Sequence, residues 1–472
     1  MPDFHSILQV ALLVLIIVMS FNVIIFVHEL GHFWAAKWRG LQIDRFQIWF
    51  GKPIWSKTVN GVQYGLGWIP AGGFVALPQM APMESIEGGS SEARKALPAI
   101  KPLDKIIVAF AGPLFSMLLA LTAAVAVWQV GKPKDFVPST RVGFVEPGSP
   151  GQKAGLLAGD TILKINGQPV KGFAGSLDSI TERIVLSRGD RITFEVQRPG
   201  IAGPLSIVTG FEMDESKWYQ RRGLRRVGFG PALDAVVDST MTRSPAEEAG
   251  LKKGDKLITV DGVRIYSPQQ FSLYLKEKNW QTVSVGVQSP DGSTREISIT
   301  PEKPLQPADS DPKIGLLWDD TREIDTRIVK PGPLTQVAES LEMMWTTITS
   351  VAAPNSNIGV DHLSGPVGIA KMQYQLLQTE DGWRRLLAFF VLFNVNLAVL
   401  NMLPFPVLDG GHITLALLEK IFGRPVKAKP LEIVQTACAL ALITLMLFVT
   451  SKDIGDGFGR GAKEKQVETV FP

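Results

Sequence analysis

Four long apolar segments divide this chain, and none of them contains Asp, Glu, Lys or Arg. They are Ile7–Val27, Ile106–Val130, Leu386–Leu403 and Ile433–Val449. A helix of about 20 apolar residues crosses a bilayer core of about 30 Å. The pattern therefore predicts a multi-pass α-helical membrane protein with four spans. With their flanking residues we place these spans at 1–37, 103–131, 383–411 and 430–451.

The polar segment between the second and third spans contains an internal repeat. Ser149–Gly167 aligns without gaps with Ser244–Gly262, and both carry Ala-Gly-Leu-x-x-Gly-Asp before an alternating strand and an Asn-Gly or Asp-Gly turn. Such turns favour tight hairpins, and self-similarity at a fixed offset predicts tandem domains. The two stretches resemble PDZ domains. This resemblance implies two α/β domains, at 138–212 and 226–304, that bind extended peptides or chain ends by adding a strand to a sheet edge.

A second β element is predicted between the first two spans, in region 38–102. Residues 43–77 alternate apolar and polar side chains around Asn60-Gly61, which is a strong hairpin signal. The segment is rich in glycine and aromatic residues, which favours a membrane-associated β-hairpin beside the first span. A small cytoplasmic sheet without substrate contact is the alternative. The other segments are a Pro-, Gly- and Ser-rich linker at 79–101, an amphipathic interfacial region at 330–380 and a polar tail at 452–472.

Charge sets the expected orientation and excludes some functions. Lys and Arg gather in the linker after the first span and in the linker between the last two, so the positive-inside rule places both linkers in the cytoplasm. The termini and the PDZ-like domains are then extracytoplasmic. The net charge of +3 gives no indication of nucleic-acid binding. The single cysteine, Cys438, excludes a disulfide framework within the chain and a cysteine-based metal site.

The first span ends in the candidate chemistry, His28-Glu29-Leu30-Gly31-His32. On a helix the two histidines lie one turn apart on one face, where both can bind a single Zn²⁺, and the glutamate can act on the metal-bound water. Ionisable residues at membrane depth are costly and are usually functional. We therefore predict a metal-dependent hydrolase site, with Glu29 as the catalytic base.

A catalytic zinc ion requires a third protein ligand and an open position for water. The best candidate is Asp409, in the segment Asn401-Met-Leu-Pro-Phe-Pro-Val-Leu-Asp409-Gly410-Gly411 after the third span. Two prolines would break the helix there, and the glycines permit a tight turn that directs the carboxylate inward. An aspartate that caps the next helix is the alternative interpretation.

These features together resemble the site-2 protease family of intramembrane zinc metalloproteases. The resemblance rests on HELGH in the first span, AGPLFS in the second, the tandem PDZ-like domains and NMLPFPVLDGG after the third. It implies one Zn²⁺ held by His28, His32 and Asp409. It also implies that Asn396 and Asn401 contact the substrate, although by sequence alone both could bond neighbouring helices. Ser116 stands where the subgroup often has asparagine, so it receives no role, and Gly112-Pro113 is interpreted as a helix kink.

The resemblance also implies the substrates and the location. It points to cleavage of membrane-protein substrates in or near their transmembrane segments, in the bacterial inner membrane. Expected substrates are anti-sigma factors after a first cut and remnant signal peptides. A non-catalytic PDZ scaffold for exported proteins is the main alternative, and a metal transporter is a weaker one. Neither alternative explains why both histidines, the glutamate and the aspartate are all present.

Overall fold

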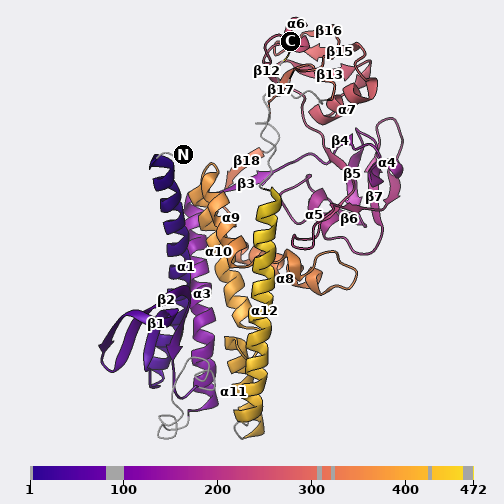
Figure 1. Cartoon of the computed structure of the whole chain (residues 1–472). Helices are drawn as coiled ribbons and strands as arrows, with labels where there is room; N and C mark the ends of the chain where they lie inside the picture. The colour runs from indigo at the N-terminus through magenta and orange to yellow at the C-terminus, as the bar shows by residue number, and fades with distance from the viewer. Residues whose placement is uncertain are drawn as a thin grey trace. The chain divides into compact units, whose positions relative to one another are not determined.

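The computed structural model describes residues 4–80, 100–305, 311–319, 325–423, 428–460 and 471 (Figure 1). Most of the predicted linker, residues 81–99, lies outside this part of the chain. The chain divides into two compact units, which are considered separately. The helical unit comprises Met1–Pro133, Ile328–Thr347 and Ser364–Ser451, and the repeat unit comprises Lys134–Arg327, Ile348–Leu363 and Lys452–Pro472.

Four helices in the described residues are long and apolar enough to cross a membrane, as the sequence predicts. They are α1 (Phe4–Trp38), α3 (Pro102–Val130), α10 (Gly382–Asn401) and α12 (Ala428–Arg460). The last of them runs nine residues past 451, where the sequence places the end of the fourth span. A shorter helix, α11 (Asp409–Phe422), begins at the candidate third ligand, after the break in the chain at the two prolines.

Helix α3 is the centre of the helical unit, because it packs against α1, α10 and α11. Its buried face consists mainly of small residues, including Ala111, Gly112, Ser116 and Ala120. Small side chains let helix backbones approach closely in a membrane. The contact with α1 is especially tight, since a Cβ on Gly31 would lie 2.4 Å from the Ala111 carbonyl oxygen.

The predicted hairpin is present as β1 (Arg45–Val59) and β2 (Val62–Ala76). Asn60 and Gly61 both have positive φ, 51° and 83°, as a two-residue type I′ turn requires. The start of β1 pairs on one edge with Gln63–Leu66 and on the other with Gly73–Ala76, so β2 folds around it. Segment 73–76 is consequently an edge strand.

The repeat unit contains two copies of one fold. The first copy has a sheet of order β6-β5-β7-β8 and a two-stranded sheet β11-β4, and the second has β14-β13-β15-β16 and β12-β17. Their elements are β4 (Val142–Val145), α4 (Pro150–Lys153), β5 (Thr161–Ile165), β6 (Gln168–Pro169), α5 (Ile180–Val185), β7 (Ile192–Gln197), β8 (Leu205–Thr209) and β11 (Phe229–Pro231). The second copy has β12 (Val237–Thr240), α6 (Pro245–Glu248), β13 (Lys256–Val260), β14 (Val263–Arg264), α7 (Pro268–Lys278), β15 (Val283–Gln288), β16 (Thr294–Ile299) and β17 (Leu316–Trp318).

The repeated sequence motifs have the same structural role in both copies. Ser149 and Ser244 each cap a short helix by accepting a bond from the backbone N–H three residues later. Asp160 is buried and pairs with Arg198, with Nε 2.7 Å from Oδ1. Its counterpart Asp255 pairs with Arg295. A buried carboxylate paired in this way is stabilised by hydrogen bonds that replace water.

Each copy also includes a strand that lies outside the predicted domain range. Strand β11 pairs with β4 but follows residue 212, and β17 pairs with β12 but follows residue 304. Both strands come after a connection in the chain and contain only three residues, so no periodicity marks them in the sequence.

The remaining elements join or flank the two copies. Two are strand pairs: β3 (Lys132–Phe136) with β18 (Asp325–Val329), and β9 (Glu212–Met213) with β10 (Arg225–Arg226). The others are helices: α8 (Pro333–Ala352), the short 3₁₀ helix Val360–His362 and α9 (Pro366–Gln378). In the repeat unit, Arg222 hydrogen-bonds the buried Asp361 carboxylate at 2.8 Å. This bond holds the pKa of Asp361 well below its usual range.

Candidate metal centre

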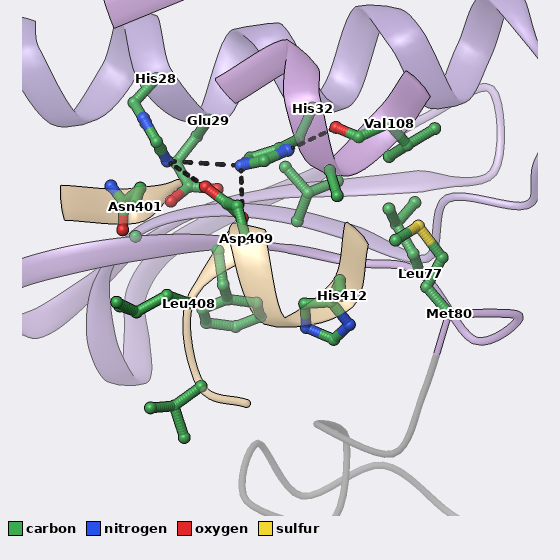
Figure 2. Close-up of a pocket in the computed structure, with 15 residues that line it drawn as sticks. His28, Glu29, His32, Leu77, Met80, Val108, Asn401, Leu408, Asp409 and His412 are labelled. Atoms are coloured by element: carbon green, nitrogen blue, oxygen red, sulfur yellow. Dashed lines mark hydrogen bonds and ion pairs between the residues drawn. The ribbon is translucent and has the colours of Figure 1, made fainter. Parts of the chain in front are cut away.

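Helix α1 presents both histidines of the motif on one face, toward α3 and α11 (Figure 2). The Nε2 atoms of His28 and His32 lie 3.3 Å apart, which a spacing of four residues on a helix permits because it puts both side chains on one face. Glu29 lies between them in sequence and lines the same cavity. The motif therefore directs two nitrogen donors and one carboxylate into a single space.

Asp409 brings a third donor from the other end of the chain. Its Oδ2 lies 3.3 Å from His28 Nε2, and its Oδ1 lies 3.3 Å from His32 Nε2. The turn before α11 requires the glycines that follow, because a Cβ on Gly410 would lie 2.2 Å from the Met402 carbonyl oxygen. The residue at the cap position of α11 is Leu408, and no side-chain cap bond forms. The geometry thus disfavours the alternative in which Asp409 only caps the helix.

The spacing of these three groups fits a zinc ion. Ligand atoms around a tetrahedral zinc ion with bonds of about 2.0–2.1 Å lie about 3.3 Å from one another. The donor set, two imidazoles and a carboxylate, is one that zinc takes in hydrolases. Asp409 Oδ2 is buried and has no hydrogen-bond partner in the described part of the chain. A bound cation would supply the missing partner for this oxygen atom.

Gly112 of α3 leaves the room that this arrangement needs. A Cβ at this position would lie 2.2 Å from His32 Nε2 and 2.9 Å from His28 Nε2. Any larger residue would therefore displace the donor atoms. The sequence suggested a helix kink at Gly112-Pro113, but the close approach of the imidazoles is the reason for a glycine here.

The second ring nitrogen of each histidine has its own partner. His32 Nδ1 lies 2.8 Å from the Val108 carbonyl oxygen, which can only accept, so Nδ1 carries the proton and Nε2 faces the site with its lone pair. His28 Nδ1 lies 2.9 Å from the Ser116 hydroxyl, which is fully buried. Such partners fix the orientation of metal-binding histidines. Sequence reasoning gave Ser116 no role, although it lies one turn after Gly112 on the same face of α3.

The donor atoms lie at the wall of a cavity of about 220 Å³. The resemblance implies that Asn396 and Asn401 contact the substrate. Asn401 lines this cavity, whereas Asn396 is not among the described residues that line it. The Asn396 Oδ1 is buried without a hydrogen-bond partner in the described residues. His412, which sequence reasoning passed over, also lines the cavity, three residues after Asp409 and so on the same face of α11.

The hairpin forms another wall of the same cavity. Gly73, Phe74 and Val75, in the edge segment of β2, line it together with Leu77 and Met80. The Gly73 backbone lies against α1, because a Cβ there would stand 3.1 Å from Glu29 Cγ. Of the two interpretations of this segment, the structure supports a hairpin beside the candidate metal centre.

Ser116→Ala is expected to weaken zinc binding by about 10- to 100-fold, because His28 Nδ1 loses the hydroxyl that orients the ring. Competition with a chromophoric chelator would measure the dissociation constant of the purified protein. Thr122→Ala is the matched control, since this exposed hydroxyl donates to the Leu118 carbonyl of its own helix and lies outside the candidate metal centre. Equal affinities for all three proteins would mean that the Ser116 contact is packing alone.

The comparisons with known proteins agree with this site. The profile of Peptidase family M50 matches residues 16–445, which include both histidines, the glutamate and the aspartate. A regulator of sigma-E protease from Salmonella typhimurium is 26% identical over 450 residues, with 91% of this chain and 95% of that protein covered. A candidate zinc metalloprotease of Neisseria meningitidis is 29% identical over 442 residues, with 90% and 95% covered.

Among solved structures, the PDZ domain of an SdrC-like protein from Listeria innocua is 28% identical. The match covers 18% of this chain and 94% of that domain, with a TM-score of 0.17. The family assignment does not depend on it, since the M50 profile spans the motif His28–His32, both repeats and the segment around Asp409. The chain therefore belongs to Peptidase family M50.

Proposed function

We propose that this protein is an intramembrane zinc metalloprotease that cleaves membrane proteins in or near their transmembrane segments. The observation that carries the proposal is the convergence of His28, His32 and Asp409, with 3.3 Å between their donor atoms, on helices that include a candidate span. Ionisable residues within a membrane span are usually functional. A metal centre on such a span is placed to hydrolyse peptide bonds in or near the bilayer.

In this proposal His28, His32 and Asp409 hold the zinc ion, and Glu29 is the general base. A zinc ion held there supplies Lewis-acid activation of a water molecule and of the scissile carbonyl. Glu29 accepts a proton from the attacking water and delivers it to the leaving amine, so the peptide bond is replaced by a carboxyl and an amino group. Asn401, at the cavity wall, is placed to hydrogen-bond the substrate backbone.

A substrate must be extended where it is cut, because a helix hides its carbonyl groups. Segment 73–76 of β2 pairs with β1 on one edge, and its residues 73–75 line the cavity. A substrate strand added to the free edge would gain backbone hydrogen bonds that replace those of its helix. The hairpin is therefore our candidate for the element that holds the substrate in extended form.

We infer the setting from the relatives and from the charge pattern. The named regulators of sigma-E protease support a membrane anti-sigma factor, already cut once, as one substrate, with remnant signal peptides as another. The Lys and Arg residues of the linkers support an orientation in the bacterial inner membrane with the active site toward the cytoplasm and the two PDZ-like domains outside. The non-catalytic scaffold is disfavoured, because it requires none of the metal geometry.

Cleavage of single-span peptides by the purified protein tests the proposal. We expect a cut within the apolar segment, and a peptide with two glycines in its span should be cut about 30-fold faster than its all-leucine counterpart. Each glycine lowers the cost of unwinding the helix by about 1 kcal/mol. Mass spectrometry of the products locates the cut. Cleavage confined to soluble flanking sequence, or none of either peptide, would contradict the proposal.

A further inference from the structure

The loop between the two repeats carries a tryptophan whose ring lies in the open. Trp218 is 89% exposed, more than any other large apolar side chain in the described part of the chain. The ring of Tyr219 meets it edge to face, with 5.7 Å between the centroids, and Lys217 Nζ lies 5.9 Å from the Tyr219 ring centroid. A single exposed apolar residue is ordinary in itself. What Trp218 does therefore depends on where the loop holds it.

The loop lies directly on the end of helix α12. Lys452 Nζ donates to the carbonyl oxygens of Trp218 and Gln220, at 2.5 and 3.1 Å. The carbonyl oxygen of Tyr219 lies against Gly455, where a Cβ would stand only 2.1 Å from it. Any side chain at residue 455 would push the loop away from the helix. The glycine thus allows a close backbone contact between the loop and α12.

An ionic network fixes the next residue of the loop to the same helix. The Arg221 N–H donates to Asp456 Oδ1 at 3.1 Å, and its guanidinium donates to Asp456 Oδ2 at 2.8 Å and to the Asp453 carboxylate. Asp453 is 3% exposed, and a buried carboxylate depends strongly on its cationic partner. The Arg221 guanidinium also donates to the carbonyl oxygens of Asp361 and Leu363, both at 3.1 Å. These bonds hold the loop in one place on α12.

The order of the contacts gives the direction of the loop along the helix. Trp218 is held by Lys452, whereas the Arg221 backbone is held by Asp456, four residues and about 6 Å further along the helix axis. The uncharged run of α12 ends at Ser451, directly before Lys452. Side chains on a helix lean toward its N-terminus, so Lys452 reaches back toward the apolar run. Trp218 is therefore at the end of the loop that lies nearest the apolar segment.

We propose that Trp218, held on α12 by the Arg221 network, lies in the bilayer interface and anchors the connection between the repeats to the lipid headgroup region. The inference rests on the proposed function in one respect, the placement of α12 across the membrane. Indole rings are favoured where a span ends, because their apolar body meets lipid while the N–H meets headgroups and water. The partner is lipid, since the ring is fixed where the helix passes from apolar to charged residues.

The test uses the full-length protein in phosphatidylcholine nanodiscs that carry a nitroxide quencher either near the headgroup or near the end of the acyl chain. A nitrobenzoxadiazole label is attached to Trp218→Cys in a Cys438→Ser background, which removes the native cysteine. Because the Trp218 side chain is exposed, its replacement keeps the packing. We expect the headgroup quencher to act at least about twofold more strongly than the acyl-chain quencher. Any other order of quenching, or none, would overturn the proposal.

Two further label sites separate the anchor from the membrane placement of α12. Leu440→Cys lies in the middle of the apolar run and is 60% exposed, so the acyl-chain quencher should act more strongly there. Val263→Cys, at an exposed position of the second repeat, should be quenched by neither. A correct result at residue 440 without quenching at 218 would refute the anchor alone. No quenching at 440 would refute the membrane placement, and with it the anchor. Equal quenching at 263 and 218 would mean general adhesion of the repeats and would also overturn the proposal.

Arg221→Ala tests whether the network on α12 sets the depth of the ring. In the protein labelled at residue 218, this change should reduce headgroup quenching by at least about half, because the loop is released from the helix. Asp456→Asn is a milder form of the same change, since Asp456 is the more exposed of the two carboxylates. Arg226→Ala is the matched control, because Arg226 pairs with Glu212 of the first repeat. Melting temperatures check the fold. Full quenching in both Arg221→Ala and Asp456→Asn would overturn the proposed role of the network.

Discussion

Glu29→Gln is expected to retain zinc at the level of the parent protein and to lose hydrolysis by about 10²- to 10⁴-fold. The three proposed ligands are untouched, whereas an amide cannot accept the proton of the attacking water. The substitution also preserves the volume beside Gly73, which lies against this side chain. Metal analysis and cleavage of a single-span peptide would be measured on the same preparation.

Glu342→Gln is the matched control for this variant. It makes the same carboxyl-to-amide change on an exposed position of α8, outside the cavity. We expect parental activity from it. If Glu29→Gln were as active as this control, Glu29 would not be the base, and the mechanism would have to pass the proton through another group.

Asp409→Ala is expected to lose zinc and activity together. The change removes one of three donors, and metal binding depends steeply on ligand number, so affinity should fall by at least about 100-fold. Asp409→Asn is the companion variant, because it keeps the volume and the turn before α11 while it removes the charge. Both proteins should be deficient in zinc when they are purified under the same conditions as the parent.

If Asp409 only stabilises the turn before α11, the opposite result is expected. An aspartate that only stabilises the turn would leave one zinc ion per chain and lower the melting temperature instead. The structure argues against this outcome, since the cap position belongs to Leu408 and the carboxylate faces both imidazoles. Stoichiometric zinc in Asp409→Ala would nevertheless show that the third ligand lies elsewhere.

The parts of this structure that were predictable from sequence are those encoded by local patterns. Uninterrupted apolar runs predicted the four candidate spans, and Asn60-Gly61 predicted a hairpin whose turn residues have the required positive φ. The His28–His32 pair was predictable because helical spacing alone brings the two rings together. Asp409 could be proposed because prolines and glycines surround it in an otherwise apolar region.

The parts that were missed depend on contacts between distant segments. Nothing local to Ser116 indicates that it meets His28 on another helix, and Gly112 gains its meaning only from the imidazoles beside it. Strands β11 and β17 are short and pair with strands far back in the chain. The polar segment after α12 gave no reason to expect a buried Phe471. Packing, which single-sequence patterns do not contain, decides all of these features.

Removal and return of the metal tests the central claim most directly. The purified protein would be stripped with a chelator, divided, and supplied with zinc or with buffer before cleavage of a single-span peptide is followed. The account predicts one zinc ion per chain before treatment, no measurable cleavage after it, and recovery of activity in proportion to the zinc returned, up to one equivalent. Cleavage that persists in the metal-free protein would contradict the assignment of His28, His32 and Asp409 as a catalytic metal centre.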